Sequence, residues 1–173
     1  PPIVQSAIQS WKGESMKVNQ ILAAFAVLCA AFAPAQAGKA KNPFLGSWKV
    51  NDGVVGPWFD GSGPSSAPDP QIAGHTINFT AKSASGSPVV ACAKSIYTIK
   101  TVEPEYLFEG SLPHPKEDAA KLGFKSEKIL VLEVGCASST GDMELSFPMV
   151  DNDTILLGLN NRVYSLKRLA PTP

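Results

Sequence analysis

The amino-acid sequence predicts an all-β protein: an antiparallel up-and-down barrel of eight or nine strands with one short helix. Three observations support this fold class. The 173 residues include 15 prolines and 14 glycines, a composition typical of turn-rich chains. Short segments alternate apolar and polar residues, as half-buried strands do. Beyond the N-terminal region, only residues 115–123 carry helix start and stop signals. Eight or nine strands are enough for a sheet to close on itself.

The N-terminal region is predicted to be an export signal. Met16 and Lys17 precede an apolar run of 13 residues, 21–33, and a small-x-small tripeptide ends at Ala37. These are the three parts of a secretory signal peptide. The run is shorter than the roughly 20 residues that span a bilayer. We expect residues 1–15 to be an upstream, non-native extension, 16–37 to be a signal peptide cleaved after Ala37, and 38–173 to form a single barrel domain.

A periplasmic or extracellular location in a bacterium follows from this prediction, with no membrane span in the mature chain. A buried core helix and a lipoprotein signal at Cys29 are the alternative interpretations of the apolar run. Cleavage after Ala37 leaves Cys92 and Cys136, and an even pair of cysteines in an exported protein predicts a disulfide. Closing a loop of about 44 residues should stabilise the fold by roughly 3–4 kcal/mol.

The first half of the mature chain is predicted to hold short strands separated by a long loop. The opening strand, 45–52, places Gly46, Trp48 and Val50 on one face, with Trp48 at the closed end of the barrel. Residues 53–73 contain too many prolines and glycines for a regular element and form a loop long enough to be a lid or a binding segment. Strands are expected at 74–81, 89–93, 95–102 and 106–110, with a turn at 83–87.

The second half is predicted to be one helix followed by a β-meander. Residues 115–123 begin with a proline, carry acids in the first turn and lysine in the last, and end on a glycine. Strands follow at 127–135, 142–150, 154–159 and 162–169, with a tight hairpin at 160–161. Large apolar side chains share the inner face of these strands: Leu130, Leu132, Val134, Met143, Leu145, Phe147 and Met149.

The pattern Gly46-x-Trp48 on the first strand, with Arg168 on the last, resembles the signature of the calycins. These are the lipocalins and their relatives, including small secreted bacterial inhibitors of metalloproteases. The resemblance implies a lipocalin-like barrel in which Arg168 packs over Trp48 at the closed end, where a cation over an indole contributes about 0.5–2 kcal/mol. It also implies that the 53–73 loop folds over the open mouth. About 136 mature residues is short for a lipocalin and somewhat long for the protease inhibitors.

The sequence offers no catalytic constellation and no metal site. Two histidines are present: His75 has the inward parity of its strand and is a candidate ligand or base near the mouth, whereas His114 lies between prolines and is most simply a loop residue. The acidic pairs at 103/105 and 151/153 fit solvated turns. Trp58 and Phe59 are the best candidates for ligand or partner contact, because aromatic residues in a loop normally pack or bind.

These observations predict an exported, non-enzymatic binding protein that needs no cofactor. The partner is either a small apolar ligand held in the barrel mouth under the 53–73 loop, or a secreted protein. An inhibitor of a secreted hydrolase, of protease or lysozyme type, with residues 39–43 as an inserting arm, is one alternative; a cell-envelope structural protein is another. The 15 basic and 15 acidic residues cancel, which argues against nucleic acid as a partner. A filled barrel would favour the protein partner.

Overall fold

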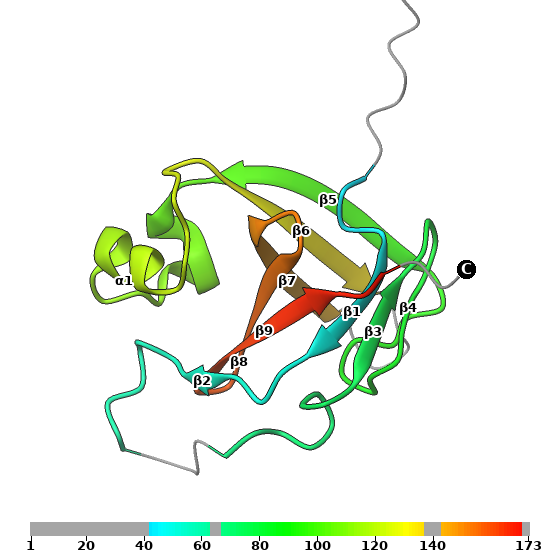
Figure 1. Ribbon diagram of the computed structural model, residues 1–173, viewed down its shortest axis with the longest axis horizontal. Helices are drawn as coiled ribbons and strands as arrows, with labels where there is room; N and C mark the ends of the chain where they lie inside the picture. Colours follow the sequence, from blue (N-terminus) through cyan, green and yellow to red (C-terminus); the bar gives the residue numbers. More distant parts are fainter. Residues whose placement is uncertain (1–41, 63–66, 137–142, 171–173) are drawn as a thin grey trace, which may run out of the picture. The chain divides into compact units, whose positions relative to one another are not determined.

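Residues 42–62, 67–136 and 143–170 are described by a computed structural model of the chain. They form an antiparallel sheet that curls into a nearly closed barrel (Figure 1). The sheet order is β4-β3-β1-β9-β8-β7-β6-β5, with β2 paired to β9, so neighbours in sequence are mostly neighbours in the sheet. The predicted all-β, up-and-down barrel is therefore confirmed.

The described residues belong to one unit, Lys41–Pro173, whereas the predicted signal peptide falls in a second unit, Pro1–Ala40, outside the described residues. Within the described ranges, no helix combines the length and the apolar character that crossing a membrane requires. The strands and helices have these bounds: β1 Gly46–Val50, β2 Val54–Val55, β3 Thr76–Phe79, β4 Ala84–Ser85, β5 Ser95–Val102, η1 Pro104–Gly110, α1 Pro115–Lys121, β6 Ile129–Cys136, β7 Met143–Asp151, β8 Thr154–Leu159 and β9 Arg162–Arg168.

Three local predictions were wrong. Residues 106–110 belong to the 3₁₀ segment η1, which is kinked at 107–109, and not to a strand, so the described residues contain two short helical segments. Pro104 starts that helix with its fixed φ, and Leu107 turns inward to a buried position. Residues 89–93 form a turn that contributes a single bridge, and β4 lies instead in the predicted 83–87 turn. Val54–Val55 pairs with β9 inside the predicted loop.

The barrel interior is filled with large side chains. Phe147 lies at the centre, and Phe79 packs edge-on against it with ring centroids 5.1 Å apart. Tyr97 packs against the other side of Phe79 at 6.3 Å. As predicted, Leu132 and Val134 point inward from β6. Residues with almost no exposed surface continue the cluster: Phe44, Trp48, Val50, Ile72, Ile77, Val90, Ile155, Leu157, Tyr164 and Leu166.

One end of the barrel is closed by Trp48 and Arg168, which lie directly opposite each other on β1 and β9. The guanidinium carbon is 4.0 Å from the centre of the indole ring, and Trp48 is completely buried. The indole N–H donates to the Phe44 carbonyl at 2.8 Å. Arg168 donates to the carbonyls of Asn152 at 2.8 Å and Leu45 at 3.0 Å, so its planar donor group ties three chain segments together.

The other end is closed by the last part of the 53–73 loop. Ile72 is fully buried in the barrel core, and the loop backbone is held by Tyr164, whose hydroxyl accepts a hydrogen bond from the Asp69 N–H at 2.8 Å. The Ile72 N–H donates to the Asp69 carbonyl at 3.1 Å, which folds this stretch into a turn. The loop thus fills the mouth with its own side chain.

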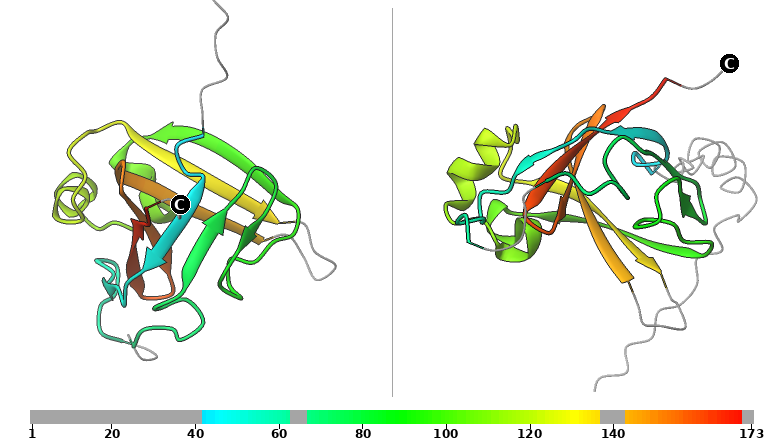
Figure 2. Two further views of the ribbon diagram at one scale, coloured as in Figure 1. Left: turned by 45° about the vertical axis from the view of Figure 1, so that its right-hand side comes forward. Right: turned by 90° about the horizontal axis from the view of Figure 1, so that it is seen from below.

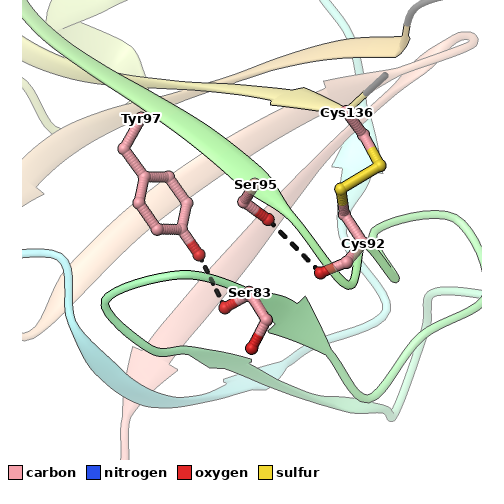
Figure 3. Close-up of a disulfide and its surroundings, with 5 residues drawn as sticks. All are labelled: Ser83, Cys92, Ser95, Tyr97 and Cys136. Carbon is pink, nitrogen blue, oxygen red and sulfur yellow. Dashed lines mark hydrogen bonds between the residues drawn. A yellow bond between two sulfur atoms is a disulfide. The ribbon is translucent and has the colours of Figure 1, made fainter. Parts of the chain in front are cut away.

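The gap between β4 and β5 is closed only at one end. Cys92, which forms an isolated bridge with Ala84, is joined to Cys136 at the end of β6 by a disulfide (Figure 3). Tyr97 on β5 donates its hydroxyl to the Ser83 carbonyl at 2.6 Å, and burial raises the pKa of this phenol. The predicted disulfide is therefore present, and it acts where the sheet is least continuous.

A second apolar cluster lies outside the barrel, where the segment containing η1 and α1 packs beside β6 and β7 (Figure 2). Leu107 and Phe124 from that segment pack with Val131 of β6, Leu156 of β8 and Val163 of β9. These strands therefore bury side chains on both faces, which explains the nearly continuous apolar sequences of β6 and β8.

Asp118 anchors this outer segment and leads to a pH-dependent prediction. Its pKa is lowered, first because Lys121 Nζ donates to Oδ1 at 3.0 Å, and next because the His114 N–H donates to Oδ2 at 2.9 Å. A lowered folded-state pKa contributes stability above the unfolded value of 3.8, and that contribution disappears as the pH falls through the folded-state pKa. We expect Asp118→Asn to lower the free energy of unfolding at pH 6 and to have progressively less effect in acid.

Urea denaturation of the wild type and Asp118→Asn at pH 6 and at about pH 2.5 measures this difference. Glu117→Gln is the matched control, because Glu117 is exposed on the same helix. An Asp118→Asn effect of equal size at both pH values would contradict the prediction.

Candidate functional site

A groove lies on the outside of the barrel, beside η1. Two adjoining cavities of about 250 and 330 Å³ share Phe108, Glu109, Glu144 and Ser146 as walls. We call them together the Phe108 groove. The first cavity is further lined by Lys100, Tyr106 and Glu133. The second is further lined by Trp58, Gly158 and Asn160.

Phe108 stands between the two cavities because η1 is interrupted there. Phe108 and Glu109 adopt left-handed backbone angles, with φ of 49° and 59°, a conformation that costs about 1–3 kcal/mol for each non-glycine residue. The following Gly110, at φ 76°, adopts the left-handed region readily. The outer cluster offsets this cost, because Leu107 is buried in it and the Phe108 ring packs on its margin.

Trp58 is brought to the groove by the β8–β9 hairpin. Its indole N–H donates to the Asn160 carbonyl at 3.1 Å, and the nearby Gly56 N–H donates to the Asn161 carbonyl at 2.8 Å. The Trp58 and Phe108 rings lie 5.3 Å apart and tilted by 42°. Gly158 permits this packing, since a Cβ there would lie 2.6 Å from Phe108 Cδ1 and 3.4 Å from the Trp58 ring.

The groove combines aromatic surface with carboxylates. Tyr106 is 71% exposed at its rim. Lys100 forms an ion pair with Glu133, and among the described residues Glu109 and Glu144 have no ion-pair partner. Such a surface can pack flat or apolar groups on its rings and accept hydrogen bonds at its carboxylates. Neither histidine lines it, and within the described ranges no three His, Cys, Asp or Glu side chains are arranged to hold a metal ion.

The three residues predicted to contact a ligand or partner lie in different places in the structure. Trp58 lines the Phe108 groove, whereas the neighbouring Phe59 is half-buried and does not. His75 is also half-buried, and its ring nitrogens face the Gly86 carbonyl at 3.0 Å and the Pro70 carbonyl at 3.1 Å. It therefore holds two loops together at the mouth. Within the predicted arm, residues 39–41 lie outside the described residues, and the Pro43 carbonyl accepts a hydrogen bond from Arg168.

Sequence reasoning missed most of the groove. Tyr106, Phe108 and Glu109 were assigned to a strand, and Glu144 was not singled out as a site residue. One signal was available in the sequence: Pro104 at the start of the 106–110 stretch and Gly110 at its end are unusual for a strand of that length. No pattern in the sequence predicted that Trp58 lies beside residues 106–110.

No protein-family model, curated protein or solved structure matches this chain. The arguments on function below therefore rest on the residues and their arrangement.

Proposed function

We propose that this chain is an exported, non-enzymatic binding protein of calycin-like fold that recognises a protein partner at the Phe108 groove. The observation that carries the proposal is the filled barrel. Ile72 occupies the mouth, and Phe79, Phe147 and Tyr97 occupy the interior where a carrier would hold its ligand. An up-and-down barrel of this size has room for side chains or for one small ligand, and here side chains take the space.

The groove suits a protein surface better than an enclosed small molecule. It offers an exposed tyrosine, the edges of Trp58 and Phe108, and carboxylates close to the rings. Tyrosine and tryptophan are enriched among the residues that contribute most to protein–protein affinity. The Trp48–Arg168 pair supports the calycin-like assignment, because it reproduces the contact that the sequence resemblance implies. The disulfide supports export, since disulfides persist in oxidising compartments.

The interior is tested by titrating the mature protein, residues 38–173, with a fluorescent fatty acid. We expect no saturable binding, because the wild-type core offers no space for the chain of the probe. Saturable binding with one molecule per barrel would overturn the proposal and favour a carrier.

The groove is tested with a photo-crosslinking amino acid in place of Tyr106, in the exported protein of its own host. The same amino acid in place of Lys94, which is exposed and does not line the groove, is the control. We expect a partner captured from position 106 and not from 94. For the purified partner, Trp58→Ala should weaken binding at least about tenfold, the range of residues that dominate an interface.

Gly158→Ala probes the same groove without removing a ring. The added Cβ would lie 2.6 Å from Phe108, so the Phe108 ring must move and the shape of the groove must change. We expect weaker partner binding, because the displaced atoms belong to the Phe108 ring, which stands between the two cavities. Val54→Ala is the matched control, since Val54 is 59% exposed on β2 and does not line the groove. If Trp58→Ala and Gly158→Ala bound the partner as tightly as Val54→Ala, the Phe108 groove would not be the binding site.

A further inference from the structure

The far edge of β5 is an open sheet edge. β5 is the last strand in the sheet order, and its eight residues pair with β6 along their whole length (Figure 1). On the other side β4 has only two residues, and the backbone contact recorded there is from the Ser95 N–H to the Lys82 carbonyl at 2.8 Å. Beyond Ser95, the described residues provide no strand that pairs with this edge.

The alternation of an antiparallel strand identifies the free backbone groups. Because Ser95 directs its N–H away from β6, Tyr97, Ile99 and Thr101 direct their N–H and C=O groups the same way. These three residues therefore present a row of donors and acceptors along the edge, where no described strand pairs with them. Such rows are templates for another strand unless they are covered or guarded by charge.

The side chains of this edge are apolar and poorly guarded. Ile96 is 66% exposed on the outer face of the sheet, and Ile99 is 40% exposed on the inner face. The single charged residue of the strand, Lys100, forms an ion pair with Glu133 on β6, which draws its ammonium group toward β6 and away from the edge. The usual protection of an edge, an unpaired lysine, is therefore weak here.

We propose that this edge pairs with the same edge of a second copy, antiparallel and centred on Ile99. In that register Ile99 lies opposite its counterpart, and Tyr97 lies opposite Thr101. Tyr97, Ile99 and Thr101 are the residues with free N–H and C=O groups, so each forms two backbone hydrogen bonds with the residue opposite it. On the outer face, Ile96 lies opposite Val102, which buries the more exposed isoleucine.

Charge selects this register over its neighbours. Centring on Lys100 would place like charges directly opposite each other, which is destabilising, and centring on Thr98 would place Ile96 opposite Lys100. In the register centred on Ile99, Lys100 faces Thr98. Residues 38–173 carry 13 basic and 14 acidic residues, a formal net charge of −1 at pH 7, so two copies repel each other only weakly overall. The second copy is therefore the occupant that the edge itself specifies.

Analytical ultracentrifugation of the mature protein tests the dimer. The protein concentration should cover about 1 to 500 µM, because one added strand pair buries less area than a standard interface and the association is therefore expected to be weak. We expect a concentration-dependent dimer. Ile99→Lys and Ile99→Glu should each weaken dimerisation at least tenfold, since each places like charges at the two-fold axis. Their equimolar mixture should form a heterodimer, because lysine then faces glutamate.

The mixture also guards against misfolding, since restored association requires that both variants fold. Val54→Lys, on an exposed position of β2, is the control and should dimerise like the wild type. A wild type that stays monomeric throughout the range would overturn the proposal, even if the edge bound an extended segment of another protein. A dimer that persists in both Ile99 variants, or one that the mixture fails to restore, would overturn it equally.

Discussion

Trp48→Ala is expected to destabilise the protein by about 3–5 kcal/mol, the cost of truncating a large aromatic residue in a core. Trp48 is completely buried, its indole N–H donates to the Phe44 carbonyl, and the Arg168 guanidinium lies over its ring. The substitution also removes the ring beneath the guanidinium, a contact worth about 0.5–2 kcal/mol. Because native domains are stable by only about 5–15 kcal/mol, much of the total would be lost.

Urea denaturation followed by circular dichroism measures this change. Trp58→Ala is the matched control, because it makes the same substitution at a half-buried position on the outside of the barrel. We expect a clearly smaller loss of stability for Trp58→Ala. If the two variants lost equal stability, Trp48 would not be the residue that closes the barrel end.

Removing the disulfide is expected to cost roughly 3–4 kcal/mol, because Cys92 and Cys136 close a loop of 44 residues. The disulfide joins Cys92, whose backbone bridges to Ala84 of β4, to Cys136 at the end of β6. It therefore holds the barrel together at the seam between β4 and β5, the two end strands of the sheet. The double variant Cys92→Ala/Cys136→Ala should unfold at markedly lower urea. The local effect should be largest at the seam, seen as faster exchange of the amide hydrogens of Ala84 and residue 92, which bond each other's carbonyls.

Reduction of the wild type with a thiol reagent is the control and should reproduce the stability of the double variant. A loss below about 1 kcal/mol would show that the reduced chain already holds the seam closed. Faster exchange spread evenly over all strands would show that the disulfide acts on the unfolded chain alone, with no local role at the seam.

The barrel and its closed end were predictable because local patterns carry them. Residue types that favour strands and the turns that bound them are local signals, so β5 and β8 were predicted at their observed bounds. Trp48 and Arg168 share the inward parity of their strands, and the register places them opposite each other. The disulfide followed from the count of cysteines.

The groove was not predictable in the same way. The stretch around Tyr106 and Phe108 has a strand-like composition. It folds instead into short helical turns with a kink at 107–109, because Leu107 and Phe108 pack on apolar residues on the outer face of β6, β8 and β9. The two left-handed residues are unfavourable locally and persist only because the surrounding packing requires them. Trp58 is held at the groove by a hydrogen bond from its indole N–H to the Asn160 carbonyl, 102 residues later in the chain.

By itself, the sequence determined the fold class, the strand faces and the cysteine pair, since each depends on short-range periodicity or on residue identity alone. The pair at the closed end was expected from the resemblance to the calycins. Tertiary structure alone decided that Ile72 fills the mouth, that η1 is a helix, that the candidate site lies on the outside of the barrel, and that β5 has an open edge. The physical reason is that these features depend on which distant surfaces meet, and on how much backbone strain the packing between them offsets.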